Sequence, residues 1–124
     1  MLKISKTENA AGRWIDYTDG VAFKVRPLTG TVLRDLRKQV STIRMAPDPK
    51  SGKFVPFEEI DDEKFNDIMS DYLLEDYRGI GDETGEVLAV TLENKKLILN
   101  QIALKDYIWN AAQALDFEEA KVKN

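Results

Sequence analysis

Carboxylates are the side chains of this sequence whose spacing could support chemistry. Asp61 and Asp62 are adjacent, and Asp82 and Glu83 form a second acidic pair shortly before Gly85. Paired carboxylates can hold a divalent cation or act as acid and base in hydrolysis. The first pair, however, precedes an apolar helical repeat, where acidic residues cap a helix and complement its dipole. The second lies in a polar turn that lacks the ligand spacing of an EF-hand. In that turn Asp82 can accept backbone donors, and Gly85 can supply positive φ. We therefore expect no metal site and no catalytic residue at either pair.

The sequence lacks the residues that other classes of catalytic site require. The chain has no His and no Cys, which excludes Ser-His-Asp and Cys-His nucleophile systems and Cys/His zinc sites. Gly79, Gly81 and Gly85 cluster, but no Gly-Lys-Ser/Thr follows them, so they do not form a phosphate-binding loop. The sequence predicts neither an enzyme nor a cofactor.

Large aromatic residues are the remaining candidates for binding. Trp14 and Trp109 are the two tryptophans, a residue type common in small cores and enriched at binding hot spots. Phe54 and Phe57 flank Pro56 in an apolar stretch that either packs back onto the core or contacts a partner. We take Phe54, Phe57 and Trp109 as candidate partner-binding residues.

Composition limits the class of protein. The length of 124 residues fits one domain, 1–124, with 1–12 as a loose arm and 118–124 as a frayed polar tail. A net charge of −4 argues against nucleic-acid binding, which needs a basic surface. No apolar run approaches the ~20 residues of a membrane span, and no apolar region follows Lys3 as in a signal peptide. We expect a soluble cytoplasmic protein.

The N-terminal third is typical of a β-hairpin. Residues 13–18 are rich in strand-forming side chains, and Asp19-Gly20 follows them. This dipeptide predicts a type I′ turn, which needs positive φ at both central residues. Pro27 lacks a backbone donor and ends the second strand. The buried face of that strand is expected to comprise Val21, Phe23 and Val25.

Two helices are expected next. The first is capped by Thr29 or Thr31 and ends by Met45, and residues 46–57 form a proline-containing loop. Its apolar stripe comprises Val32, Leu33, Leu36, Val40 and Ile43. The second helix opens at Asp61 or Asp62 and is stopped by Gly79 and Gly81. Its stripe comprises Phe65, Ile68, Met69, Tyr72 and Leu73.

Two further helices complete the expected fold. Thr91 caps a short one, and Asp106 caps the last, in which Ile108, Ala112 and Leu115 line one side. The predicted fold class is α+β, mostly helical, with a small N-terminal β-hairpin packed on about four helices.

The segment 72–94 has a recognisable order of residue types. An aromatic residue (Tyr77), a glycine (Gly79) and an apolar residue precede an acidic turn ending at Gly85, and a helix then begins at Thr91. This order resembles the loop signature of the tail assembly chaperones of long-tailed bacteriophages and prophages. The likeness extends to the N-terminal hairpin and the paired C-terminal helices. The family is expected to carry Trp where this chain has Tyr77, which keeps an aromatic anchor.

The resemblance implies a binding function without catalysis. Such chaperones coat the apolar, helical tape measure protein until tail tube subunits polymerise around it. The implied partners are therefore the tape measure protein and, at a later stage, the tail tube protein, in the cytoplasm of a bacterial host. Weak homo-oligomers are compatible with this function, and Tyr77 joins the candidate partner-binding residues. Many members also exist as a longer version made by ribosomal frameshifting.

Two other classes of function stay open. One is a structural virion component, such as a head-to-tail joining protein, which would form a stable ring in isolation. The other is a small interaction module, ligand-binding subunit or enzyme. A ligand-binding or catalytic protein would need a concave pocket with converging polar groups, for which the sequence offers no evident residues.

Overall fold

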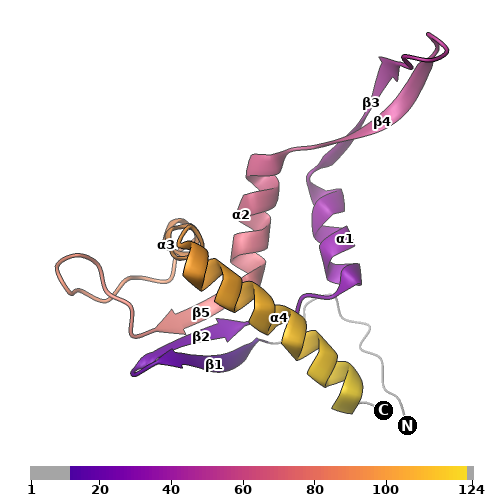
Figure 1. Cartoon of the computed structure of the whole chain (residues 1–124). Coiled ribbons are helices and arrows are strands. Elements are labelled where there is room, and N and C mark those ends of the chain that lie inside the picture. The colour runs from indigo at the N-terminus through magenta and orange to yellow at the C-terminus, as the bar shows by residue number, and fades with distance from the viewer. Residues whose placement is uncertain (1–11, 123–124) are drawn as a thin grey trace.

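The structure is a computed structural model that describes residues 12–122, and it consists of a body from which one long hairpin projects (Figure 1). The described residues form four helices and five strands in two antiparallel sheets. In chain order these are β1 (Arg13–Thr18), β2 (Val21–Val25), α1 (Gly30–Gln39), β3 (Ser41–Pro47), β4 (Phe54–Ile60), α2 (Asp62–Leu73), β5 (Leu74–Arg78), α3 (Leu92–Leu99) and α4 (Ile102–Val122).

The body is built on a three-stranded sheet in the order β1-β2-β5. The hairpin expected from residues 13–25 is present, with Ile15 opposite Phe23. Its turn is not type I′, because Gly20 has a φ of 76° and no non-glycine residue of the described chain has positive φ. The register instead shifts between Asp16 and Thr18, so a bulge beside the turn closes the hairpin.

The third strand of this sheet, β5, lies where we expected the second long helix to continue. We expected that helix to run to Gly79, but it ends at Leu73 and the chain continues as β5, which places Tyr77 opposite Phe23 of β2. Gly79 then takes a φ of 78°, and a Cβ there would lie 2.0 Å from the carbonyl oxygen of Gly20. Glycine is therefore required where β5 leaves the sheet beside the β1–β2 turn.

Three helix starts are confirmed by their capping hydrogen bonds. The side chain of Thr29 accepts from Val32 N, that of Asp61 accepts from Lys64 N, and that of Thr91 accepts from Asn94 N. Each satisfies a backbone donor that has no partner within the helix. The expected cap at Asp106 is wrong, because α4 already begins at Ile102.

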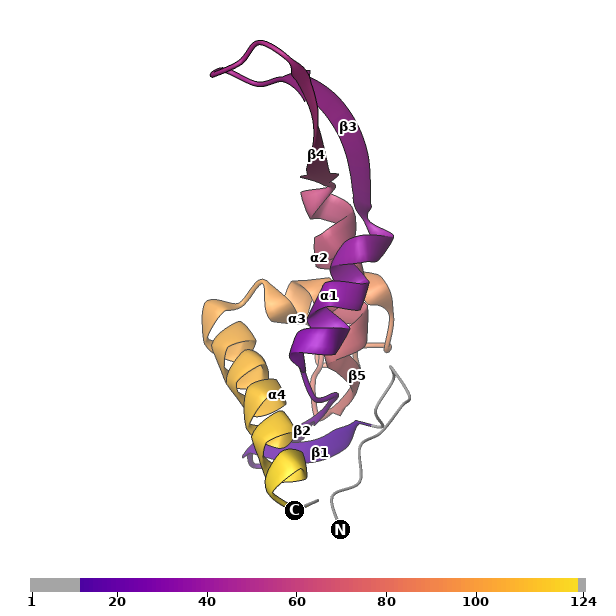
Figure 2. The ribbon, with the colours of Figure 1, turned by 90° about the vertical axis from the view of Figure 1, so that its right-hand side faces the viewer.

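The core lies between the sheet and the helices. Figure 1 shows α1 and α2 side by side, and Figure 2 shows α4 running obliquely past them to the β1–β2 end of the body. The largest fully buried side chains are Phe23, Val25, Leu74 and Ile108. Phe23 and Val25 were expected on the buried face of β2, where Val21 is only partly buried. The expected α2 stripe also faces this core, with Met69, Tyr72 and Leu73 buried and Phe65 and Ile68 partly buried.

The segment 41–60 departs most from expectation. The first helix ends at Gln39 instead of Met45, and β3 and β4 form a second antiparallel hairpin where we expected a helix end and a loop. Ile43 therefore does not join the stripe of α1, and its side chain is 66% exposed. We call this hairpin, Ser41–Ile60, the arm; it extends away from the helices in both ribbon views.

The expected architecture is wrong in its strand content. The chain is α+β with five strands in two sheets among its described residues, so it is not a mostly helical protein with one N-terminal hairpin. The two missed features, β5 and the arm, account for the difference.

The structure describes only part of the two chain ends. The loose N-terminal segment expected for 1–12 lies outside the described residues except for Gly12. At the other end, where a frayed tail was expected for 118–124, α4 continues as far as Val122. Within residues 12–122, no helix has both the length and the apolar character needed to cross a membrane.

Candidate protein-binding surfaces

The arm exposes an apolar surface along one of its two faces. Residues directly opposite each other in an antiparallel pair share a face, and the register places Met45 opposite Pro56 and Pro47 opposite Phe54. The exposed fractions are 66% for Ile43, 59% for Met45 and 68% for Phe54. We call this side the apolar face of the arm; it comprises Ile43, Met45, Pro47, Phe54 and Pro56, with Glu58 as its one charged member.

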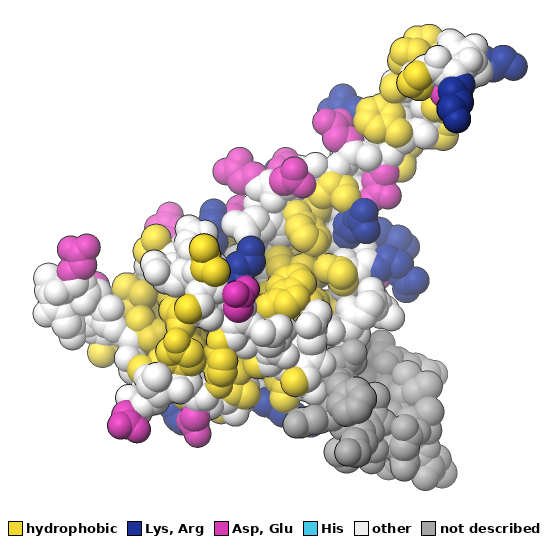
Figure 3. All heavy atoms as spheres, viewed as in Figure 1, with side chains coloured by type: hydrophobic (Ala, Val, Ile, Leu, Met, Phe, Trp, Pro, Cys, Tyr) yellow, Lys and Arg dark blue, Asp and Glu magenta, His cyan; other side chains and the backbone are white. Residues whose placement is uncertain are grey.

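The opposite face of the arm is mixed. Arg44 lies opposite Phe57, and its guanidinium forms an exposed ion pair with Glu59. Phe57 and Val55 are 42% and 40% exposed on this side. The two candidate phenylalanines therefore lie on opposite faces of one hairpin, and neither packs into the core. Figure 3 shows the apolar side chains running along the arm toward its tip, where dark-blue basic groups gather.

Trp109 lies at a different surface. It lines a groove of about 430 Å³ between α2 and α4, together with Phe65, Met69 and Leu73 from α2. The polar lining comes from Asn66, Ser70, Asn100, Lys105 and Asp106. A groove between two helices with an apolar floor can accept one face of an amphipathic helix. The structure does not bring Trp109 together with Phe54 and Phe57 on one surface.

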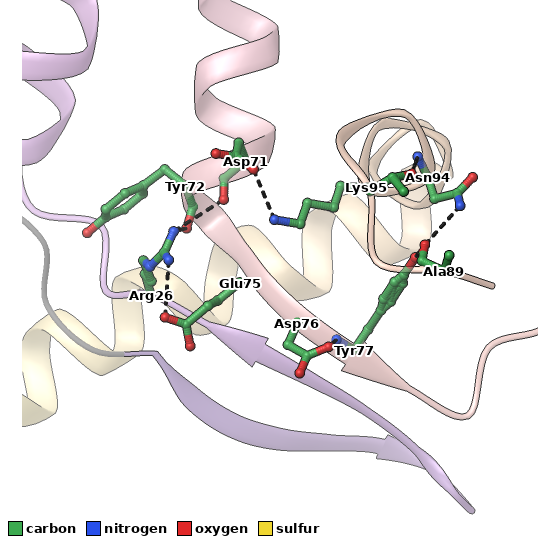
Figure 4. Close-up of polar contacts among 10 residues, drawn as sticks. Arg26, Asp71, Tyr72, Glu75, Asp76, Tyr77, Ala89, Asn94 and Lys95 are labelled. Atoms are coloured by element: carbon green, nitrogen blue, oxygen red, sulfur yellow. Dashed lines mark hydrogen bonds and ion pairs between the residues drawn. The ribbon is translucent and has the colours of Figure 1, made fainter. Parts of the chain in front are cut away.

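Tyr77 is a core residue. Its side chain is 6% exposed, and its hydroxyl donates to the carbonyl oxygen of Ala89. Burial raises the pKa of the Tyr77 phenol, and the nearby carboxylate of Asp76 adds to that rise. Asn94 donates to the same carbonyl at 2.8 Å (Figure 4), so Tyr77 fixes the chain before α3. Its position inside the body does not offer it to a partner.

A polar cluster next to Tyr77 joins the sheet to α2. Arg26 follows β2, and its guanidinium donates to the carbonyl of Tyr72 at 3.1 Å and to Glu75 Oε1 at 3.1 Å (Figure 4). Lys24 Nζ lies 2.9 Å from the other carboxylate oxygen. The hydrogen bond from Lys24, with support from Arg26, lowers the pKa of the Glu75 carboxyl. This arrangement holds the junction between α2 and β5, which gives it a structural role.

The acidic turn is explained by its own hydrogen bonds. Asp82 Oδ1 accepts from Thr84 N at 2.8 Å, from Thr84 Oγ1 at 2.6 Å and from Glu86 N at 3.1 Å. The hydrogen bond from Thr84 is the main reason that the pKa of Asp82 is lowered. Gly85 has the positive φ expected for the turn, 89°. The predicted role of Asp82 as an acceptor of turn donors is confirmed.

The other acidic pair also has a structural explanation. Asp61 caps α2 and Asp62 lies in its first turn, where a negative charge complements the helix dipole. In the part of the chain that the structure describes, no three acidic residues come close enough together to hold a metal ion.

Sequence reasoning missed the residues of β3. Ile43 continues the spacing of the α1 stripe, and that continuation concealed the change to a strand. A signal was present: Ser41, Thr42 and Ile43 follow one another, and β-branched residues with polar neighbours favour strands.

No protein-family model, curated protein or solved structure matches the chain. The surfaces just described and the residues of segment 72–94 are the features of the chain that indicate a function.

Proposed function

We propose that this chain is a phage or prophage tail assembly chaperone that binds and solubilises a tape measure protein during tail morphogenesis. The observation that carries the proposal is the gathering of exposed apolar side chains on the arm, away from the core. The order of residues around Tyr77, Gly79 and Thr91 supplies the family resemblance. Under this proposal the protein works in the cytoplasm of the bacterial host and is not an enzyme.

The arm suits a binding role on physical grounds. An isolated two-stranded hairpin is marginally stable in water, and exposed contiguous apolar patches mark interaction surfaces. None of its residues belongs to the core cluster of the body. Its apolar face is therefore available to a partner, and a long helix with exposed apolar side chains has matching chemistry.

The groove between α2 and α4 supplies a second contact of the same kind. Trp109, Phe65 and Met69 offer apolar area to one face of a helix, and Lys105 and Asp106 offer polar contacts beside it. Two weak contacts on one chaperone bind a long partner with avidity and still allow release when the tail tube assembles.

Co-expression tests the proposal. The chain is produced together with the long, helical, apolar protein encoded immediately downstream, and the soluble yield of that protein is measured. We expect the yield to rise with the intact chain and to fall with Phe54→Ala or Trp109→Ala. Asp82→Asn is the matched control, because its turn lies on neither surface. Absence of both co-purification and any change in solubility would refute the chaperone proposal.

A head-to-tail joining protein is the alternative that the same experiment leaves open. Such a virion component would form a ring of fixed size in isolation, whereas a chaperone would be a monomer or a mixture of weak oligomers. Mass measurement of the purified chain distinguishes the two.

A further inference from the structure

The two edges of the arm differ in their free backbone groups. Asp61 N donates to Val40 O at 3.0 Å, and Asp48 N donates to Lys53 O at 2.8 Å, so hydrogen-bonded pairs stand at both ends of an arm whose register has no shift. Such pairs alternate with pairs whose N–H and C=O groups point outward. The outward groups of β3 are therefore those of Ser41, Ile43 and Met45.

The same alternation shows that the β4 edge is blocked. Its outward positions are Phe54, Pro56, Glu58 and Ile60, and Pro56 interrupts them because it supplies no N–H. Proline in β3 lies only at the end, at Pro47. The β3 edge thus presents three uninterrupted donor and acceptor positions, which is the arrangement that another strand can extend.

We propose that the β3 edge pairs with the β3 edge of a second copy of this chain, antiparallel and centred on Ile43. The three open positions are symmetric about Ile43, so Ser41 of one copy meets Met45 of the other and every outward group finds a partner. Arg44 lies opposite Thr42 of the second copy, which keeps the two Arg44 side chains from facing each other. The product is a four-stranded sheet in the order β4-β3-β3-β4.

Charge permits a second copy as the occupant, because Arg44 is the one charged residue of β3 and lies opposite Thr42 in this register. The two-fold axis is perpendicular to the sheet, so both apolar faces lie on the same side. Ile43, Met45 and Phe54 of the two copies then form one continuous apolar surface, twice the size of either alone.

The inference depends on the arm alone and holds whether or not the partner is a tape measure protein. It deepens the proposed function in one respect, because a doubled apolar face binds a long partner over a larger area.

Two proline variants test the edge. Ile43→Pro removes the central outward donor of β3, whereas Glu58→Pro removes the donor of the residue directly opposite, on the β4 edge. Neither N–H takes part in the pairing of β3 with β4. By sedimentation equilibrium we expect a monomer–dimer equilibrium, weakened at least about tenfold by Ile43→Pro and unchanged by Glu58→Pro. A monomer at all concentrations, or equal effects of the two variants, would overturn the proposal.

Disulfide trapping tests the register without proline. The chain has no cysteine, so the Thr42→Cys variant and the Arg44→Cys variant can each be oxidised alone and then as a mixture of the two proteins. In the proposed register, Thr42 of one copy and Arg44 of the other form a non-hydrogen-bonded pair, whose Cα atoms lie ~4.5 Å apart, within disulfide range. Two copies of the same residue are offset by two positions and lie ~7–8 Å apart. We expect covalent dimers from the mixture and few from either variant alone. Equal yields in all three samples, or no dimer in the mixture, would contradict pairing about Ile43.

Discussion

At the scale of single residues, Gly79 carries the tightest steric requirement among the described glycines. A side chain there meets the carbonyl of Gly20 and also needs a positive φ. We expect Gly79→Val to lower the free energy of unfolding by at least about 3 kcal/mol, because strain and close contact add. Urea unfolding followed by circular dichroism measures this change.

Two control variants separate the causes. Gly20 has nearly the same φ, 76°, but nothing lies within 4 Å of a Cβ placed there, so Gly20→Ala should cost only about 1 kcal/mol. Asp82→Asn, in an exposed turn, should also cost about 1 kcal/mol or less. A Gly79→Val loss no larger than these would contradict the account of the β5 exit.

The same turn yields a prediction about metals. The Asp82 carboxylate already accepts three hydrogen bonds from Thr84 and Glu86. We therefore expect calcium or magnesium to leave the melting temperature of the protein unchanged. A metal-dependent rise that disappears in Asp82→Asn would show that the turn binds a cation and would reopen a catalytic role.

Glu75 makes stability depend on pH in acid. Its pKa is lowered from 4.5 in the folded state by hydrogen bonds and ion pairs with Lys24 and Arg26. A lowered folded pKa contributes stability that is complete above the unfolded pKa and is lost as the pH falls through the folded pKa. The stability advantage of the native chain over Glu75→Gln should therefore be larger at about pH 7 than at about pH 3. An advantage that stays constant across this range would contradict the assignment.

At the scale of elements, three of the four helix starts in the described chain were predictable because their signals are local. Thr29, Asp61 and Thr91 each stand before an apolar repeat, and a cap acts over only three residues of sequence. The apolar stripe of α2 was predictable for the same reason. The candidate site was predictable in part: Phe54, Phe57 and Trp109 are surface residues or line a groove, whereas Tyr77 is in the core.

The missed strands depend on distant partners or on misleading neighbours. β5 begins directly after α2 without a turn, and its partner β2 lies about fifty residues earlier in the chain. Pairing of that kind leaves no local signal. The arm was not predicted because Pro47 and Pro56 are typical of loops. In the structure each lies at a strand position whose N–H would face outward, so neither proline removes a hydrogen bond between β3 and β4. The same geometry explains why the register of the arm was not predictable.

The position of the phenylalanines on the arm gives a prediction about stability. Because Phe54 and Phe57 are exposed and lie outside the core cluster, Phe54→Ala and Phe57→Ala should each change the free energy of unfolding by less than about 1 kcal/mol. Phe23→Ala, at a fully buried site, is the matched control and should cost about 3–5 kcal/mol. Because the two arm residues lie on opposite faces, partner binding measured with each variant alone identifies the face in use. A large drop in melting temperature with binding retained would mean that they act in folding instead.

At the scale of the whole molecule, the body and the arm have separate sources of stability. The core cluster joins β2, β5 and all four helices, and it contains no residue of the arm. The arm is held together by the antiparallel pairing of β3 with β4. The molecule therefore combines a self-sufficient body with a projecting element whose exposed side chains are free to bind.

Removal of the arm tests this division. Val40 O and Asp61 N are already hydrogen bonded at 3.0 Å, so an Asn-Gly linker can replace residues 41–60 and keep Asp61 as the cap of α2. We expect the shortened chain to fold with a melting temperature within about 5 °C of the full chain, measured by circular dichroism. It should lose self-association and most of its effect on partner solubility. Failure to fold would make the arm part of the body. A folded chain that still solubilises the partner would instead place binding at the groove between α2 and α4, because that groove is the surface left intact.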